Sequence, residues 1–394
     1  MDARLFDRAR ESVSIEDLAR QLTKLTRSGS ELRGPCPICQ AGQKSASPPF
    51  AVMPAKGKFR CYGCDERGDV VDLEQLVRGG TNVEAARRLA GGTFERAARV
   101  DARPLPRDDG AAAVARLKTA QEMLAEARPI AGTLAERYLR ARRIPDEVIA
   151  AAAGNLLFHP FARVSWNAEA RSWTRAPALL LRPCTAAGPT GGVHATYLLR
   201  DGSGRDKALG KKMWGPQHGP DGRHAGAWLI GPEPGDWAGP GSPLAVGEGV
   251  ETVLSIVALR LRAGVRMRAC AALSLTRLQG GEARDVDGCV DPFRAVPDVE
   301  RPPFTWPRPE PGGWDEVVVG VDRDMSPVRV RGKSPRGHVL HYERDGELRA
   351  RLCGQLAVMG WRRAGAPRAR AIVPPVGADF NDELRRVMAR ERAA

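Results

Sequence analysis

Four cysteines near the start of the chain are spaced as two pairs that fit one metal ion. Cys36-Pro-Ile-Cys39 and Cys61-Tyr-Gly-Cys64 are C-x-x-C knuckles, each supplying two sulfurs from one tight turn. Zinc prefers four such thiolates in a tetrahedron, and four protein ligands leave no open position for chemistry. We therefore predict a structural Zn²⁺ ion held by Cys36, Cys39, Cys61 and Cys64.

The residues between the knuckles alternate as two strands around a turn at 54–57, which predicts a zinc-ribbon hairpin. Basic and aromatic side chains on such a hairpin suit single-stranded DNA, because they combine phosphate contact with base stacking. The alternative is that the rings pack the small core of the ribbon, and we expect one ring inward and the basic groups outward. The candidates for single-stranded DNA binding are Lys58, Phe59, Arg60 and Tyr62.

Acidic residues follow three apolar, strand-like runs in the second half of the chain. Carboxyl ends of parallel strands meet at one edge of an α/β sheet, which is where ligands bind. Carboxylates that meet there repel one another unless a cation lies between them, and hard oxygen ligands favour Mg²⁺ or Mn²⁺. Each group alone has the alternative of ordinary loop acids, but their order favours a site. The candidate ligands are Glu248 after the first run, Asp322 and Asp324 after the second, and Asp379 or Asp382 after the third.

Three lysines precede the first acidic group: Lys207, Lys211 and Lys212, just before Met213-Trp214-Gly215. By position they are candidates for contacting template or nucleotide phosphates, with a solvated basic loop as the alternative. They lack the G-x-x-x-x-G-K-[ST] spacing of a phosphate-binding loop. Because the chain has no such motif, we predict no fused helicase and expect any helicase to be a separate partner.

The elements that must position these residues predict a multi-domain α/β fold. Helices are predicted at 14–25, 69–77, 81–90, 111–127, 133–144, 250–262 and 346–362, and strands at 178–182, 193–199, 244–247, 317–321 and 371–373. Strand–helix alternation from 243 onward predicts a parallel βαβ core. We predict a zinc-ribbon domain at 1–91, a linker and helix at 92–131, the N-terminal part of a catalytic core at 132–242 and its parallel-sheet domain at 243–394. A Pro-rich insertion at 280–313 has no assigned role.

Charge and composition limit the function. The 61 Lys and Arg residues against 47 Asp and Glu give a net charge of +14, which suits a polyanionic partner. No signal sequence and no apolar run of membrane-spanning length is present, so we predict a cytoplasmic chain without membrane contact. Two C-x-x-C pairs with four scattered cysteines indicate metal binding rather than a disulfide framework.

The stretch GPCPIC…SPPFAVMPAKGKFRCYGCDERGDVVDLEQLV resembles the zinc-binding domain of DnaG-type bacterial and phage DNA primases, with Cys39 where many members have histidine. The ordered acids resemble the Toprim domain, whose E-G and D-x-D motifs match Glu248, Asp322 and Asp324. The region from about 132 resembles stand-alone primase-like proteins of phages and mobile elements. This resemblance implies a nucleotidyltransferase, a DNA-directed RNA polymerase that makes RNA primers from NTPs on a single-stranded DNA template in DNA replication.

Two other functions remain open. A Toprim nuclease would use the same Mg²⁺ or Mn²⁺ ligands for hydrolysis, whereas none of the four tyrosines has the context of a strand-cleaving topoisomerase. A non-catalytic single-stranded DNA-binding protein would use the zinc module and the acidic domain only for docking. Products formed from NTPs and a single-stranded template distinguish the three.

Overall fold

The computed structural model of the chain describes residues 3–39, 48–64, 66–79, 82–91, 111–167, 170–232, 237–307, 313–375 and 379–393. These residues form two compact units. One lies within Met1–Asp109 together with Ser326–Ser334 and His338–Arg344, and the other comprises Gly110–Met325, Pro335–Gly337 and Asp345–Ala394. Residues 92–110 of the predicted linker lie outside the described residues. The predicted domain boundaries stay a proposal.

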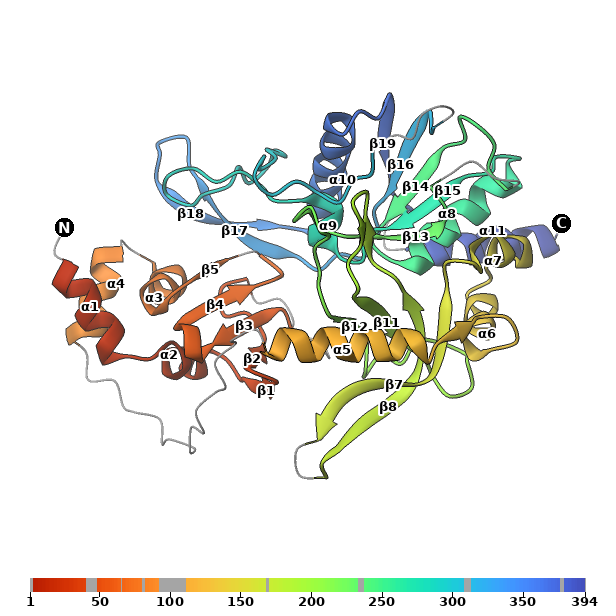
Figure 1. Cartoon of the computed structure of the whole chain (residues 1–394). Coiled ribbons are helices and arrows are strands. Elements are labelled where there is room, and N and C mark those ends of the chain that lie inside the picture. The colour runs from red at the N-terminus through yellow and green to blue at the C-terminus, as the bar shows by residue number, and fades with distance from the viewer. Residues whose placement is uncertain are drawn as a thin grey trace. The chain divides into compact units, whose positions relative to one another are not determined.

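The first unit combines a five-stranded sheet with four helices (Figure 1). The strands are antiparallel in the order β1 (Thr26–Ser28), β2 (Glu31–Gly34), β3 (Phe50–Met53), β4 (Lys58–Cys61) and β5 (Arg67–Gly68). The helices are α1 (Ala3–Ser12), α2 (Ile15–Leu22), α3 (Val70–Arg78) and α4 (Asn82–Gly91). The predicted hairpin turn is present, and Gly57 ends it with a φ of 60° that favours glycine. Helix α1 was not predicted.

Helix α3 begins with a reciprocal cap that explains the motif Gly68-Asp69-Val-Val-Asp72. Asp69 accepts hydrogen bonds from the amides of Val71 and Asp72, and Asp72 accepts one from the amide of Asp69. A Cβ at Gly68 would lie 2.4 Å from Asp72 Cβ, so glycine is needed where Asp72 folds back. Asp69 also accepts from Arg10 Nε at 3.0 Å, which ties α1 to the start of α3.

A second hairpin belongs to the first unit although it comes late in the chain. β17 (Val328–Lys333) pairs antiparallel with β18 (Val339–Arg344), and Arg331 Nη1 donates to Gln75 Oε1 of α3 at 3.2 Å. The period-2 alternation of Val328 and Val330 with arginines was its sequence signal. It was not predicted.

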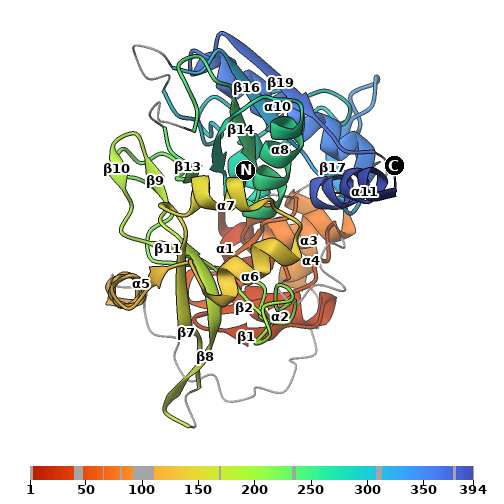
Figure 2. The same ribbon diagram turned by 90° about the vertical axis from the view of Figure 1, so that its right-hand side faces the viewer.

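The second unit contains an antiparallel sheet followed by a parallel one (Figure 2). The antiparallel sheet has the order β12 (Lys211–Trp214), β11 (Val193–Tyr197), β8 (Ser172–Leu181), β7 (Leu157–Asn167) and β6 (Arg128–Pro129). Helix α5 (Ala111–Ala125) packs on it through Ala120 and Met123. Short strands β9 (Cys184–Thr185) and β10 (Gly188–Pro189) form a separate ladder, and α6 (Leu134–Ala141) and α7 (Asp146–Ala152) lie between β6 and β7 in sequence.

The parallel sheet has the order β13 (Ala227–Ile230), β15 (Arg268–Ala271), β14 (Leu244–Gly247), β16 (Glu316–Gly320) and β19 (Arg368–Ile372). All neighbours are parallel except β13 with β15. Its helices are α8 (Val250–Arg262), α9 (Leu275–Gln279), α10 (Gly346–Arg363) and α11 (Phe380–Ala393). The predicted multi-domain α/β class with a parallel core is confirmed, and α8 has the predicted bounds.

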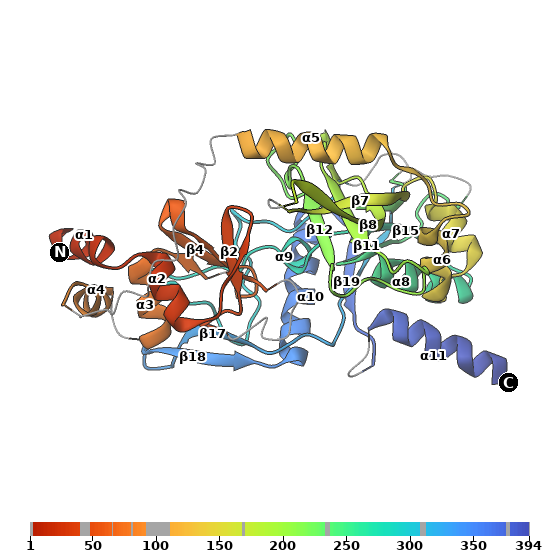
Figure 3. The same ribbon diagram turned by 90° about the horizontal axis from the view of Figure 1, so that it is seen from below.

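Both faces of the parallel sheet are covered, as its continuous apolar strands require. Ala245 and Val318 face a core formed with α8, α6, α7 and α11. Leu244, Val246 and Val317 face the opposite core, formed with α9 and α10. Figure 3 shows the helices of the two faces from below.

The insertion at 280–313 contributes to the second of these cores. Phe304 is buried there, beside Trp314 and Trp361, and its amide donates to the carbonyl of Arg277 in α9. A Cβ at Gly226 would lie 2.6 Å from the Phe304 ring. The described part of the insertion therefore covers one face of the sheet. Among the described residues, no helix is both long and apolar enough to cross a membrane.

Replacing Asp69 by alanine removes the α3 cap and one of the two carboxylate partners of Arg10. We expect a loss of about 1–2 kcal/mol of stability, seen as faster amide exchange of α3 in hydrogen-exchange mass spectrometry. Asp7→Ala, which removes only an exposed pair with Arg10, is the control and should change exchange little. Unchanged exchange of α3 in Asp69→Ala would show that the cap is dispensable.

Candidate functional site

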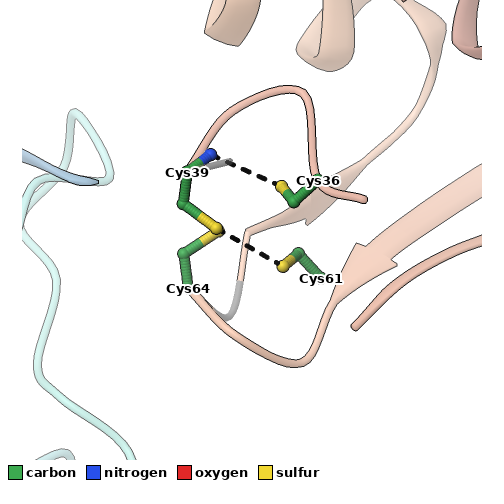
Figure 4. A group of neighbouring side chains, drawn as sticks. All are labelled: Cys36, Cys39, Cys61 and Cys64. Atoms are coloured by element: carbon green, nitrogen blue, oxygen red, sulfur yellow. Dashed lines mark hydrogen bonds between the residues drawn. The ribbon is translucent and has the colours of Figure 1, made fainter. Parts of the chain in front are cut away.

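The four cysteines meet at one point between β2 and the end of β4 (Figure 4). Their sulfurs all lie within 4.8 Å of one another, with Cys39 Sγ 3.9 Å from Cys61 Sγ. The turns of both knuckles direct amides at the sulfurs: Ile38 and Cys39 donate to Cys36, and Gly63 donates to Cys61. Amides of this kind stabilise negative charge on sulfur.

This donor set fits zinc. Hydrogen bonds among the thiols, with burial in addition, raise the pKa of Cys36 and Cys64 far above the ordinary value. A bound cation would instead hold the sulfurs as thiolates. The Cys₄ cluster supports a structural Zn²⁺ ion.

The two aromatic candidates on the ribbon lie differently. Phe59 is buried against Phe50, with ring centroids 5.6 Å apart, so the proposal that Phe59 stacks on a base is wrong: its ring fills the core. Tyr62 is 45% exposed, and the guanidinium carbons of Arg33 and Arg60 each lie 4.9 Å from its ring. Tyr62 and Arg60 remain candidates for DNA contact, as does Lys58, which lies 3.6 Å from Asp69.

Replacing Cys61 by serine should release the metal. Structural zinc contributes about 10–16 kcal/mol of apparent binding free energy in zinc-finger peptides, so we expect lost zinc and an unfolded first unit. Zinc content per chain by mass spectrometry and circular dichroism measure this. Cys184→Ser, which changes a cysteine of the second unit, should keep the zinc. Full zinc content in Cys61→Ser would exclude the four-cysteine site.

The acidic candidates follow three neighbouring parallel strands. Glu248 comes directly after β14, Asp322 two residues after β16, and Asp379 at the start of α11, after β19. Because these strands are adjacent and parallel, their carboxyl ends share one edge. The predicted convergence of the strand ends is present in the sheet order.

Asp322 is held in place on both oxygens. Thr252 Oγ1 donates to Oδ2 at 2.8 Å, and the Phe380 amide donates to Oδ1 at 3.3 Å. Burial, with the charges of Asp379 and Asp324 in addition, raises the pKa of Asp322 to about 6. Partial burial and the charges of Asp379 and Asp382 also raise the pKa of Asp324. The negative charges of Asp324 and Asp379 thus act on Asp322, and those of Asp379 and Asp382 act on Asp324.

The acidic side chains at this edge do not lie as close together as the ligands of one metal ion. Among the described residues, the four cysteines are the only group of three or more Cys, His, Asp or Glu whose ligand atoms lie within 4.8 Å of one another. Glu248 is exposed, and Asp379 Oδ1 accepts from the Asp382 amide at 2.7 Å, which caps α11. The edge is a set of carboxylates that a cation would draw together.

Glu251 is a largely buried acid, with its side chain 12% exposed, and the sequence did not reveal its role. It accepts from Tyr138 Oη of α6 and from Lys211 Nζ of β12, at 3.1 Å for the lysine. Burial alone would raise the pKa of Glu251, but the Lys211 charge and the Tyr138 hydroxyl outweigh it, and the pKa lies well below the ordinary value. Lys211 thus links the antiparallel sheet to α8, and this pairing reduces its availability for phosphate.

The other two lysines differ in their surroundings. Lys212 Nζ donates to the carbonyl of Val164 at 2.8 Å and lies 4.2 Å from the centre of the Trp214 ring. Lys207 is exposed in the loop before β12. Lys207 is therefore the lysine of the three that is best placed to meet a phosphate.

Sequence reasoning missed a basic groove beside α6. It has a volume of about 590 Å³, and its lining includes four exposed arginines and one acid, Asp206. The arginines are Arg128, Arg137, Arg175 and Arg200. Phe161, 65% exposed, adds an aromatic face. Arginines with an open ring are suited to single-stranded nucleic acid.

Changing Glu251 to glutamine should destabilise the second unit by about 3 kcal/mol at neutral pH, because Lys211 loses its buried partner. A carboxyl group whose pKa is lower in the folded state stabilises the fold at pH values above its unfolded-state pKa, near 4.3. This stabilisation is lost as the pH falls through the folded-state pKa. The difference from wild type should therefore shrink below about pH 4. Urea unfolding from pH 7 to 3 measures it, with Glu147→Gln, from an exposed pair, as control. A pH-independent difference would contradict the ion pair.

Two family models match the chain. Residues 1–98 match the CHC2 zinc finger, and residues 114–224 match a domain of unknown function, DUF7146. The first match contains all four cysteines. The second contains the arginine groove together with Lys207, Lys211 and Lys212.

Curated relatives are DNA primases. The DNA primase of Mycobacterium tuberculosis strain H37Rv is 38% identical over 95 residues, 23% of this chain and 14% of the primase. The DNA primase of Streptomyces coelicolor is 36% identical over 83 residues, which are 21% of this chain and 12% of that primase. The chain thus matches about a seventh of the length of these relatives. The zinc-binding and RNA polymerase domains of Aquifex aeolicus primase are 15% identical at a TM-score of 0.31, covering 99% of this chain and 84% of that one.

The resemblance to DnaG-type primases is confirmed for the zinc module, which is of the CHC2 type. The Toprim assignment and an origin in a phage or mobile element stay predictions. The roles of the acidic and basic residues likewise rest on the geometry of the chain itself.

Proposed function

We propose that this chain is a DNA primase, which makes short RNA primers on single-stranded DNA by metal-dependent nucleotidyl transfer. The observation on which this rests is the acidic edge after β14, β16 and β19 in a chain that also has a CHC2 zinc ribbon. A 3′-hydroxyl attacks the α-phosphate of an NTP, and pyrophosphate leaves. Such a reaction needs positioning and charge stabilisation rather than a protein nucleophile.

Glu248, Asp322 and Asp324 are the proposed Mg²⁺ or Mn²⁺ ligands, with Asp379 or Asp382 as the third acidic position. The mutual repulsion of the aspartates fits a cation site. When bound, the metal lowers the pKa of the attacking hydroxyl and neutralises the leaving group. Thr252 and the Phe380 amide keep the Asp322 carboxylate in one orientation, so that the edge is organised in advance.

Template and nucleotide phosphates are proposed to meet the basic side chains. Lys207 and the four groove arginines are exposed in the second unit, and none of these arginines forms an ion pair with a carboxylate of the described residues. Tyr62, with Arg33 and Arg60, is the proposed stacking site on the ribbon. A separate replicative helicase is the proposed partner, and the proposed location is the cytoplasm.

The test is a template-dependent primer assay with labelled NTPs, single-stranded DNA and Mg²⁺ or Mn²⁺. Asp322→Ala with Asp324→Ala should lower primer synthesis at least about 100-fold, because charge stabilisation at the reacting phosphate is lost. Removing two mutually repelling acids should leave the thermal midpoint unchanged or higher. Asp146→Ala with Glu147→Ala, two exposed acids of α7, is the matched control.

The products decide between functions. Undiminished primers in the double variant would show that the site is assigned wrongly. A shortened template without primers would identify a nuclease. Tight binding of single-stranded DNA with neither product would identify an accessory protein.

A further inference from the structure

Strand β19 is an edge of the parallel sheet, since among the described residues it pairs only with β16. The carbonyl of Ile372 accepts from the Val321 amide beyond β16. Alternate residues of a strand direct their backbone groups to the same side, so Ala369 and Ala371 direct theirs away from the sheet. Arg362 of α10 confirms this direction at Ala369, because its Nη2 donates to that carbonyl at 3.3 Å.

A groove of about 440 Å³ lies beside this edge, between β19 and α10, which lie side by side in Figure 1. Its floor is made of small or aliphatic side chains: Ala350, Gly354 and Val358 of α10, and Ala369, Ala371 and Val373 at β19. A Cβ at Gly354 would lie 2.8 Å from Ala371 Cβ, so glycine permits the close approach of helix and strand. Val373 is 40% exposed.

The rim of the groove is basic. It contains Arg323, Arg351, Arg362 and Arg370 against one acid, Glu347. Arg323 is 3.5 Å from Glu347, and Arg370 pairs with Glu316 of β16. Arg351 and Arg362 form no ion pair with a carboxylate of the described residues, and both are exposed. The groove therefore has an apolar floor, a strand edge that is open at Ala371, and surplus positive charge.

We propose that this groove binds an extended acidic peptide segment of a partner protein, which adds to the sheet as a strand beside β19. Main-chain groups would pair with Ala371, alternate apolar side chains would enter the floor, and acidic side chains would meet Arg351 and Arg362. Nucleic acid fits less well, because the floor offers no aromatic ring for a base and a strand edge matches a polypeptide backbone. A second copy fits poorly because the chain has a net charge of +14.

Fluorescence anisotropy of the full chain with labelled seven-residue peptides tests this. We expect binding of a peptide alternating aspartate and valine, and at least about tenfold weaker binding of a lysine–valine peptide, because like charges would meet. Replacing the central valine of the acidic peptide by proline should also weaken binding, because proline removes a ladder donor.

Two variants locate the site. Arg351→Glu should weaken the acidic peptide about tenfold or more, whereas Arg363→Glu, on the same helix outside the groove, should change affinity about twofold or less. Ala371→Pro removes only an outward amide, which edge strands tolerate, and should keep the thermal midpoint while weakening the peptide about tenfold.

Three results would overturn the proposal. One is an equal effect of Arg351→Glu and Arg363→Glu, and another is unchanged peptide affinity in Ala371→Pro. The third is that the peptide fails to bind while labelled oligothymidylate loses affinity in Arg351→Glu only, which would make the groove a nucleic-acid site. A doubled mass in sedimentation that Ala371→Pro abolishes would instead identify a second copy as the occupant.

Discussion

The parallel pairing of β14, β16 and β19 is the constraint on which the acidic edge of the second unit depends. Because β14, β16 and β19 run in the same direction, the acids that follow them are brought to one edge. Specific hydrogen bonds hold the acids of this edge. Thr252 and the Phe380 amide donate to Asp322, and the Asp382 amide donates to Asp379. Helices α8 and α11 supply these groups from their first turns, where unpaired amides and the helix dipole favour negative charge.

The neighbouring acid Glu251 is not part of this edge, because its charge is already neutralised. It lies three residues beyond Glu248 and is paired with Lys211 of β12 and Tyr138 of α6. Arg142, after α6, lies 5.7 Å from the Tyr138 ring and exchanges hydrogen bonds with Asn381 of α11. These contacts join the antiparallel part to the helices of the acidic edge. The helices that support the acidic edge are therefore joined to the antiparallel part of the second unit.

Local patterns in the sequence predicted much of the fold. Helices begin at the predicted positions Ser14, Asp69 and Thr133, each of which caps its helix, because capping depends on residues a few positions apart. The C-x-x-C spacing within each knuckle is likewise local, and it predicted the cysteine cluster. The partners of Glu251 could not be predicted, since Lys211 and Tyr138 are 40 and 113 residues away in sequence. The burial of Phe59 likewise depends on its packing against Phe50.

The two proposed metal sites differ in what they require from the chain. The four cysteines are drawn together by short turns with amides directed at sulfur, and a metal there completes a closed shell that stabilises the fold. The proposed carboxylate ligands follow three strands whose parallel pairing brings them to one edge, and among the described residues no three of them have ligand atoms within 4.8 Å of one another. A closed site favours permanent occupancy, whereas an open set of oxygens leaves positions for water and phosphate. The first arrangement suits a structural ion, and the second suits an ion that arrives with a nucleotide.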